Sequence, residues 1–192
     1  TIPSSVSRWE ARALIHAWRF ELPPRIADFI KSEANLPPSP DDPRFSSHQV
    51  HIIASARQSL EAAAHYAEVA NVPAVILSDS IEGEARDVGA VHAALLREVA
   101  IRNRPFRKPV VILSGGETTV TLNGKGRGGR NGEFLLSLAI AAEGMPFAAL
   151  AADTDGIDGS ENNAGAFATG ETASRLRASG HNPRGLLAIN DS

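Results

Sequence analysis

Apolar residues recur at helical spacing near the start of the chain. Leu14 and Trp18 lie four positions apart within residues 8–20, and Ser7 stands where the N-cap of that helix belongs. Two prolines at 23–24 then introduce a second apolar segment with the same spacing. Because proline is favoured in the first turn of a helix, we predict two short helices here.

A proline-rich segment, residues 36–47, separates these helices from a different pattern. Such a segment is typical of a loop, and it is the best internal boundary in the chain. After it, short apolar runs alternate with longer helical stretches. The alternation predicts strands at 49–54, 72–77 and 108–113, and helices at 55–71 and 83–103. The fold class that follows is α/β, with a mostly parallel sheet and crossover helices.

The rhythm changes in the last third of the chain. Glycines 115–116 separate the third strand from a threonine-rich segment that we predict to be another strand, residues 118–122. A glycine-rich basic loop, an apolar helix at 131–142 and a buried strand at 147–152 come next. The apolar run 186–189 predicts a last strand, with the polar residues 190–192 as its turn. We therefore read both chain ends as truncations of a longer protein.

Composition excludes several classes of protein. The 192 residues are 43% hydrophobic and carry a net charge of −3, which disfavours non-specific nucleic-acid binding. Cysteine is absent, so disulfides and thiolate chemistry are excluded and a cytoplasmic location is favoured. The apolar runs are all shorter than the roughly 18 residues of a membrane span.

The glycine-rich loop is the most informative segment. Four glycines alternate with three cations between a strand and a helix; the glycines are Gly124, Gly126, Gly128 and Gly129, and the cations are Lys125, Arg127 and Arg130. Glycine allows backbone N–H groups to approach a ligand, and a helix N-terminus adds partial positive charge. Arginine binds phosphate or carboxylate through two donors. The loop thus predicts a site for a small polyanion, with an exposed, flexible basic tip as the alternative.

Two standard phosphate motifs differ in how well they match. The chain contains no Gly-x4-Gly-Lys-Ser/Thr segment, so the Walker A loop is excluded. Gly124, Gly126 and Gly129 do match the Gly-x-Gly-x-x-Gly spacing of dinucleotide-binding loops, and Asp153 follows where a ribose-binding acid would stand. An NAD(P) site therefore stays open as an alternative.

An acidic loop follows the buried strand 147–152. Asp153, Asp155 and Asp158 place three carboxylates within six residues, where they repel one another unless they are solvated, hydrogen-bonded or neutralised. Magnesium prefers such oxygen ligands, so we predict Asp155 and Asp158 as its ligands. Aspartates that cap local turns are the alternative.

Weaker signals lie elsewhere. Gly115, Gly116, Glu117 and Thr118 bring N–H groups and a hydroxyl to a sheet end, where they can bind phosphate or form a tight connection. The acidic residues of segment 82–86 can cap the long helix that follows. The chain has no Gly-x-Ser-x-Gly elbow, so a hydrolase triad has no anchor.

Several of these segments together resemble one known family. Leu113–Thr121, Gly124–Asn131 and Thr154–Gly159 look like the signature blocks of the MOFRL domain, the C-terminal half of glycerate 2-kinases, which are also described as hydroxypyruvate reductases. Residues 81–86 and Asn190-Asp191-Ser192 resemble further family blocks. The resemblance implies a Rossmann-like N-terminal domain, whose tail would be residues 1–101. Residues 102–192 would then be a MOFRL domain truncated at its C-terminus.

The resemblance also implies an activity: ATP-dependent, magnesium-dependent phosphorylation of D-glycerate to 2-phosphoglycerate in a cleft between the two domains. Arg130 and Asp155 would be catalytic, and Asn131 and Asn190 would join the loop residues in binding substrate or phosphate. We expect glycerate and a nucleotide as partners, neither nucleic acid nor membrane, and allow for a homodimer. An NAD(P)-dependent hydroxypyruvate reductase and a non-catalytic anion-binding module are the alternatives.

Three features depart from the family pattern. The catalytic lysine of the N-terminal part has no counterpart here, so we expect the isolated chain to be inactive. Gly132 stands where the family has glutamine, and Asp153 stands where a small residue is common. Neither substitution removes a cation or an acid, so the kinase interpretation is kept.

Overall fold

The computed structural model describes residues 6–32, 38–49 and 51–192. Its contacts divide the chain into two compact units, residues 1–52 and 53–192. Within the described residues, no helix is both long and apolar enough to cross a membrane.

The first unit holds helices α1 (Arg8–Ala17) and α2 (Pro24–Lys31) and the short 3-10 helix η1 (Pro43–Phe45). The Ser7 hydroxyl accepts a hydrogen bond from the Glu10 backbone N–H, and the Glu10 carboxylate accepts one from the Ser7 N–H. This reciprocal capping fixes the start of α1. Both predicted helices are confirmed, and η1 lies in the predicted loop, of which residues 36 and 37 are outside the described residues.

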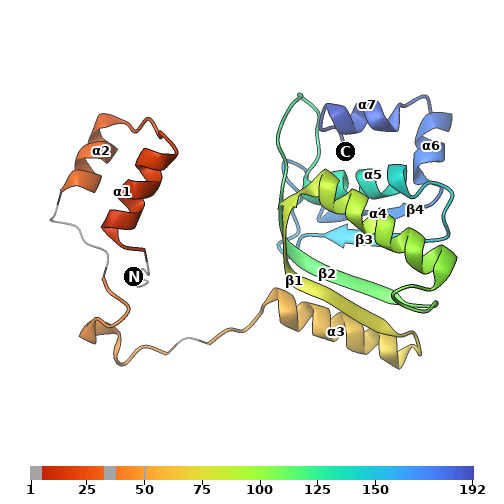
Figure 1. Cartoon of the computed structure of the whole chain (residues 1–192), viewed down its shortest axis with the longest axis horizontal. Coiled ribbons are helices and arrows are strands. Elements are labelled where there is room, and N and C mark those ends of the chain that lie inside the picture. Colours follow the sequence, from red (N-terminus) through yellow and green to blue (C-terminus); the bar gives the residue numbers. More distant parts are fainter. Residues whose placement is uncertain (1–5, 33–37, 50) are drawn as a thin grey trace. The chain divides into compact units, whose positions relative to one another are not determined.

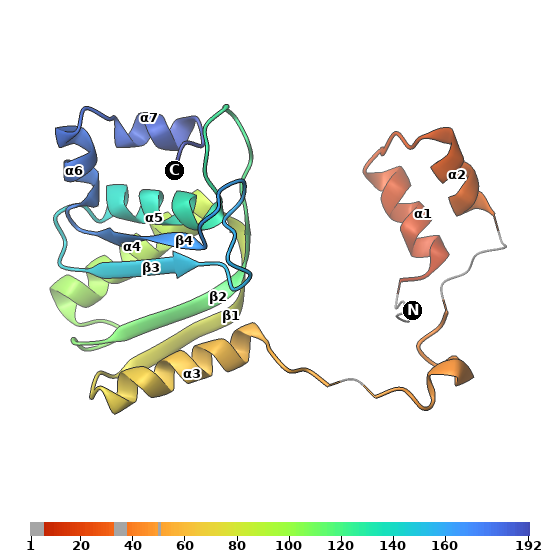
Figure 2. The ribbon, with the colours of Figure 1, turned by 180° about the vertical axis from the view of Figure 1, so that it is seen from behind.

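The second unit contains the remaining elements: α3 (Ala56–Val69), β1 (Ala74–Glu84), α4 (Ala85–Arg102), β2 (Val111–Thr119), α5 (Arg130–Ala141), β3 (Ala148–Ala152), β4 (Gly165–Thr169), α6 (Thr172–Ala178) and α7 (Pro183–Ala188). Strands β1 and β2 pair in parallel, and β3 and β4 pair antiparallel. Figures 1 and 2 show α3 on one side of β1 and β2, and α4 and α5 on the other. The predicted α/β class is confirmed.

The crossover β1-α4-β2 brings the carboxyl ends of two parallel strands together, with Glu84 opposite Thr119. Strand β2 runs without a break through the glycine pair that was predicted to separate two strands. Gly116 lies opposite Ile81, and a Cβ on Gly116 would stand 2.0 Å from the Ile81 carbonyl oxygen. The glycine therefore allows β1 and β2 to approach, so the expected break between two strands is wrong.

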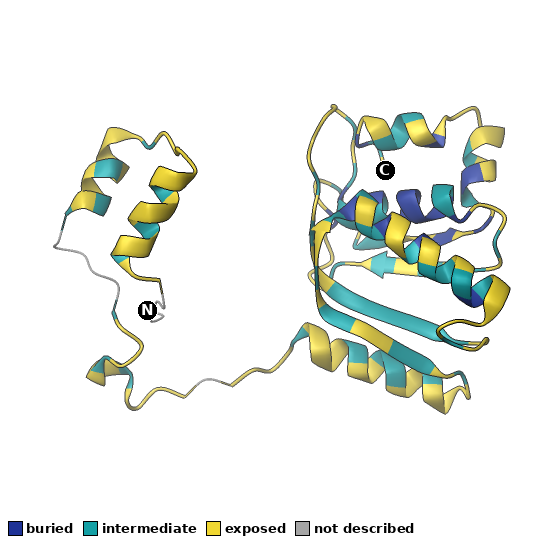
Figure 3. Cartoon of the chain, in the orientation of Figure 1, coloured by how far each residue is buried: buried dark blue, intermediate teal, exposed yellow. Residues whose placement is uncertain are grey.

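The core lies between α4, α5 and the β3–β4 pair, where Figure 3 shows the buried positions gathered. Its buried members are Ala93, Leu135, Leu138, Ala139, Ala142 and Ala168. Four of these six are alanines, so the helices pack closely on the sheet. Helix α5 contributes three of these buried residues, Leu135, Leu138 and Ala139, and apolar burial is the main driving force of folding. Helix α5 is therefore central to the stability of this unit.

Two predicted strands are wrong. Residues 51–54 form no strand, residue 50 lies outside the described residues, and Ile53 is 92% exposed. An apolar run without a neighbouring strand has no partner for its backbone groups. The run 186–189 is mostly helical instead, because Pro183 begins α7 and the Asn182 side chain caps it.

Strand β4 was not predicted. Its segment, Gly-Ala-Phe-Ala-Thr, carries little of the β-branched pattern that marks strands, and pairing with β3 decides its conformation. The predicted boundary between residues 101 and 102 stays a prediction. It falls at the last residue of α4, inside the unit 53–192.

Candidate functional site

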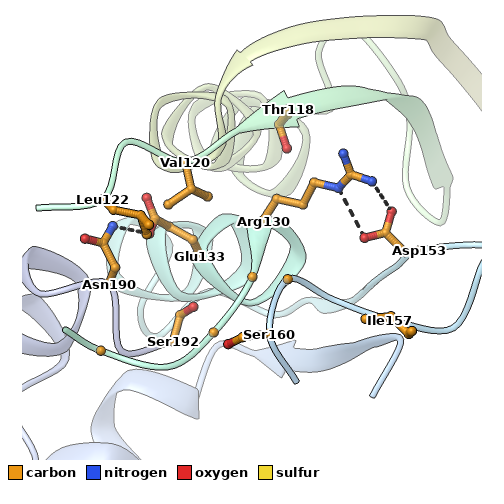
Figure 4. A pocket seen from close by; sticks show the side chains of 14 residues that line it. Thr118, Val120, Leu122, Arg130, Glu133, Asp153, Ile157, Ser160, Asn190 and Ser192 are labelled. Carbon is orange, nitrogen blue, oxygen red and sulfur yellow. Dashed lines mark hydrogen bonds and ion pairs between the residues drawn. The ribbon is translucent and has the colours of Figure 1, made fainter. Parts of the chain in front are cut away.

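A cavity of about 550 Å³ opens where β2 and β3 end (Figure 4). Its walls come from the end of β2, the glycine-rich loop, the start of α5, the loop after β3 and the C-terminal turn. The lining residues are Thr118, Val120, Leu122, Gly126, Gly128, Gly129, Arg130, Glu133, Asp153, Ile157, Gly159, Ser160, Asn190 and Ser192. Strand ends, a glycine loop and a helix start thus meet around one hollow.

Arg130 is the positively charged residue among those that line the cavity. Its Nε and Nη2 donate to the two carboxylate oxygens of Asp153 at 3.1 and 2.8 Å, and its Nη1 donates to Glu117. The hydrogen bonds that Arg130 donates to Asp153, and then the one that it donates to Glu117, raise the pKa of the guanidinium above its ordinary value. With 31% of the side chain exposed, the guanidinium is held in place yet remains open to the cavity.

The N-terminus of α5 is capped from across the chain by Asp158. This carboxylate is 3% exposed. Its oxygens accept the backbone N–H groups of Asn131 at 3.0 Å and Gly132 at 2.9 Å. The Asn131 side chain donates to both Asp153 and Asp158, and so connects the cap to the Arg130 ion pair. The helix-terminal N–H groups predicted for a ligand are therefore engaged by the protein itself.

The predicted magnesium ligands do not share a metal site in this structure. Both oxygens of Asp158 accept hydrogen bonds from α5, and the exposed Asp155 accepts one from the Ile157 N–H in its own loop. Across residues 6–32, 38–49 and 51–192, no three His, Cys, Asp or Glu side chains form a group that could hold a metal ion. The residues present do not fit a resident magnesium ion, and the role of Asp155 stays a prediction.

The glycines of the loop face the C-terminal turn of the chain. The Gly126 N–H donates to the Ile189 carbonyl at 3.0 Å, and a Cβ on Gly126 would lie 2.4 Å from the Asp191 nitrogen. A Cβ on Gly129 would lie 2.3 Å from an Asp158 carboxylate oxygen. Close packing within the fold thus explains Gly126 and Gly129.

The loop cations differ in their surroundings. Arg127 makes a two-point ion pair with Glu161, at 3.1 and 2.8 Å, while Lys125 is exposed. Among the predicted site residues, those that line the cavity are Thr118, Gly126, Gly128, Gly129, Arg130 and Asn190. Glu117 reaches it through Arg130, whereas Gly115, Gly116, Lys125, Arg127, Asn131, Asp155 and Asp158 are not among its lining residues.

The ion pair between Glu133 and Arg86 was not predicted from the sequence. Glu133 is 1% exposed, and its Oε1 accepts from the Arg86 Nε at 2.8 Å. A glutamate three positions after Arg130 reads as an ordinary first-turn acid of a helix. The signal that could have marked it is its position on the same helix face as buried leucines, since an acid there needs a partner.

Glu84 does not cap α4 as predicted for segment 82–86. It occupies the N-cap position without a side-chain capping bond, and its carboxylate instead accepts from the Thr121 hydroxyl and N–H and from the Thr119 hydroxyl. These hydrogen bonds, those from Thr121 first, lower the pKa of Glu84 below its ordinary value. The acid ties β1 to the chain that leaves β2.

Comparisons with known proteins agree with this architecture. Residues 110–192 match the model of the MOFRL family. A protein named "Putative hydroxypyruvate reductase" from Agrobacterium vitis is 43% identical over 100% of this chain and 50% of its own length. A D-glycerate 2-kinase from Thermotoga maritima is 39% identical over 77% of this chain and 36% of its own length. The chain spans about half the length of the curated relatives it matches, or less.

A solved structure gives the same result in three dimensions. The crystal structure of glycerate kinase from Thermotoga maritima superposes with a TM-score of 0.80 and 33% identity, covering 98% of this chain and 44% of that one. The blocks at residues 113–121, 124–131, 154–159 and 190–192 fall within the matched segment, and each contributes residues to the lining of the cavity. Residues 110–192 therefore match the MOFRL family, and the proteins to which the chain is similar carry the names glycerate 2-kinase and putative hydroxypyruvate reductase.

Proposed function

We propose that the full-length protein carrying this chain phosphorylates glycerate, with ATP as the donor and 2-phosphoglycerate and ADP as products. The observation that carries the proposal is Arg130, a part-buried guanidinium held at the cavity by Asp153. The names of the relatives and of the superposed structure support the substrate class.

The Arg130 guanidinium is suited to binding an anionic group, such as a carboxylate or a phosphoryl group on which negative charge develops during the reaction. A guanidinium has five N–H donors, and the three hydrogen bonds to Asp153 and Glu117 leave two for a ligand. Asp153 fixes the plane of the guanidinium, so little side-chain entropy is lost when a carboxylate or phosphate binds. In phosphoryl transfer, such positioning and charge neutralisation supply most of the catalysis.

The reaction balances without a further reactant. The 2-hydroxyl oxygen of glycerate bonds to the γ-phosphorus, the bond to the β–γ bridging oxygen breaks, and the hydroxyl proton is released. We assign Arg130 to the transferred phosphoryl group or the glycerate carboxylate, and Lys125 to long-range attraction of the polyanion. Asp155 stays the candidate that orients the hydroxyl. In this proposal magnesium enters as part of the nucleotide substrate, MgATP.

The test is ADP release from MgATP by the full-length protein, with and without D-glycerate. Arg130→Ala should lower kcat/KM about 10²–10³-fold, as removal of a charge-stabilising donor does in other enzymes. Arg130→Lys keeps the charge but loses the two-point geometry, and should recover only part of the rate. ADP release that does not depend on glycerate, or an unaltered Arg130→Ala variant, would refute the proposal.

A hydroxypyruvate reductase is the second candidate, favoured by the name of the Agrobacterium vitis relative and by the Gly124, Gly126 and Gly129 spacing. The geometry of the loop argues against it. Gly126 donates its N–H to Ile189, so that N–H is not free for a pyrophosphate. NAD(P)H oxidation with hydroxypyruvate, measured on the same preparation, should be absent. Oxidation without ADP release would favour the reductase, and phosphate binding with neither activity would favour an anion-binding module.

A further inference from the structure

Glu133 and Asn190 form a buried polar connection under the glycine-rich loop. Glu133, on the first turn of α5, is 1% exposed, and Asn190 is 4% exposed. The Asn190 Nδ2 donates to the Glu133 Oε2 at 2.9 Å, as the dashed line in Figure 4 marks. On its other side Glu133 accepts from Arg86, which supplies the partner that a buried carboxylate requires.

The Asn190 side chain also forms hydrogen bonds with the glycine-rich loop. Its Oδ1 accepts the backbone N–H groups of Asn123 at 2.7 Å and Gly124 at 3.2 Å. An amide has one accepting and one donating end. Since a carboxylate only accepts, Glu133 binds the donating end of Asn190 and so turns the oxygen toward the loop.

The rest of the C-terminal turn holds the same loop. The Arg127 N–H donates to the Asp191 carboxylate at 2.9 Å, and the Ser192 N–H donates to the Arg127 carbonyl at 3.0 Å. The loop that carries Lys125 and leads into Arg130 is therefore shaped by residues 189–192. Glu133 and the Thr121 carbonyl, which accepts from the same Asn190 Nδ2 at 3.3 Å, together orient the amide of this turn.

We propose that Glu133 is a positioning residue of the anion site and acts through Asn190. This rests on the proposed function in that the positioned loop is taken to bind the substrate anions. Asn190, which the sequence placed among the phosphate-binding residues, then holds the loop rather than the phosphate. Glu133 gives the shorter of the two hydrogen bonds that hold the Asn190 Nδ2, 2.9 Å against 3.3 Å for the Thr121 carbonyl, and a carboxylate can only accept there.

Glu133→Gln tests the orientation. If the glutamine oxygen keeps Arg86, its NH2 group faces the Asn190 NH2 group, and Asn190 must rotate. Both loop N–H groups then lose their acceptor. The Asn123 and Gly124 amides should exchange hydrogen at least tenfold faster, and KM for MgATP should rise about tenfold with a smaller change in kcat. Glu143→Gln removes a carboxylate from another arginine pair, that with Arg177, and should change neither.

The double variant Glu133→Gln/Asn190→Asp separates positioning from general stability. One oxygen of the aspartate can accept from the glutamine NH2 group and the other from the loop. Asn190→Asp alone sets two carboxylates against each other. The double variant should therefore restore slow exchange at Asn123 and Gly124 and recover most of the KM, relative to either single change. If Glu133→Gln does not fold, the test is whether the double variant has slower exchange at Asn123 and Gly124 and a lower KM than Asn190→Asp alone.

Titration of the full-length protein with inorganic phosphate, monitored by NMR chemical shifts, tests the inference without relying on turnover. Phosphate binding weakened by Glu133→Gln and recovered in the double variant supports the inference even if no glycerate-dependent ADP appears. Loop exchange and phosphate affinity equal to those of Glu143→Gln would overturn it. A double variant no better than Asn190→Asp would overturn it as well.

Discussion

Asp158 and Gly132 lie 26 residues apart in sequence, yet an oxygen of the buried Asp158 carboxylate, Oδ2, accepts the Gly132 N–H at 2.9 Å at the start of α5. The other oxygen accepts the Asn131 N–H, so one carboxylate satisfies two of the N–H groups that a helix leaves free. The acidic loop after β3 thus caps α5 and fixes the N-terminus of the helix, where Arg130 lies.

Asp158→Asn should destabilise the unit 53–192. One of the two N–H groups would face an NH2 group instead of an oxygen, which costs about 2 kcal/mol of unfolding free energy. Asp155→Asn is the matched control, because its Oδ1 bond to Ile157 can be kept, and it should cost less than about 0.5 kcal/mol. Urea unfolding with and without a chelator measures both. Equal effects of the two variants, or a loss caused by the chelator, would point to a shared metal site.

Gly129→Ala should be more damaging than Gly144→Ala. At Gly129 the added methyl group would stand 2.3 Å from an Asp158 oxygen, and overpacking of this kind costs about 2–3 kcal/mol. Gly144 has a φ of +76° and nothing within 4 Å of the added carbon, so alanine there carries only conformational strain, about 1 kcal/mol. Thermal unfolding of the two variants compares them. The reverse order would mean that the loop can move away from Asp158.

Glu117→Gln should strengthen anion binding. The Glu117 side chain is 75% exposed; its carboxylate accepts a hydrogen bond from the Arg130 Nη1 and adds negative charge beside the cavity. Removing an exposed charge of this kind changes affinity by a few-fold, so the Kd of inorganic phosphate should fall about two- to fivefold at low ionic strength. Weaker phosphate binding would show that Glu117 orients Arg130 instead of competing for it.

The stability contributed by Glu84 should depend on pH. Hydrogen bonds from Thr121 and Thr119 lower the pKa of Glu84 from its ordinary value of 4.5. A lowered folded-state pKa stabilises the protein above the unfolded-state value, and this contribution is lost as pH falls through the folded-state pKa. The unfolding free energies of the protein and of Glu84→Gln should thus differ at pH 7 and converge below pH 4.5. A difference independent of pH would assign the effect to packing.

Local sequence was sufficient for much of the second unit's framework. The pattern of apolar residues predicted α3, α4 and α5, and the short apolar runs predicted β1, β2 and β3. These elements follow from interactions within a few residues, such as Ser55 accepting the Gln58 N–H at the start of α3. Strand β4 and helix α7 were not predicted as such, because their short segments depend on pairing and capping partners.

For the site, the sequence by itself determined the chemistry that is present: a basic glycine-rich loop, an acidic loop and an arginine at a helix start. Only the tertiary structure decided what each group does, because the deciding contacts join distant positions. Asp153 to Arg130 spans 23 residues, and Asn190 to Glu133 spans 57. A carboxylate's role depends on the donors that surround it once it leaves water, and those donors are gathered by folding.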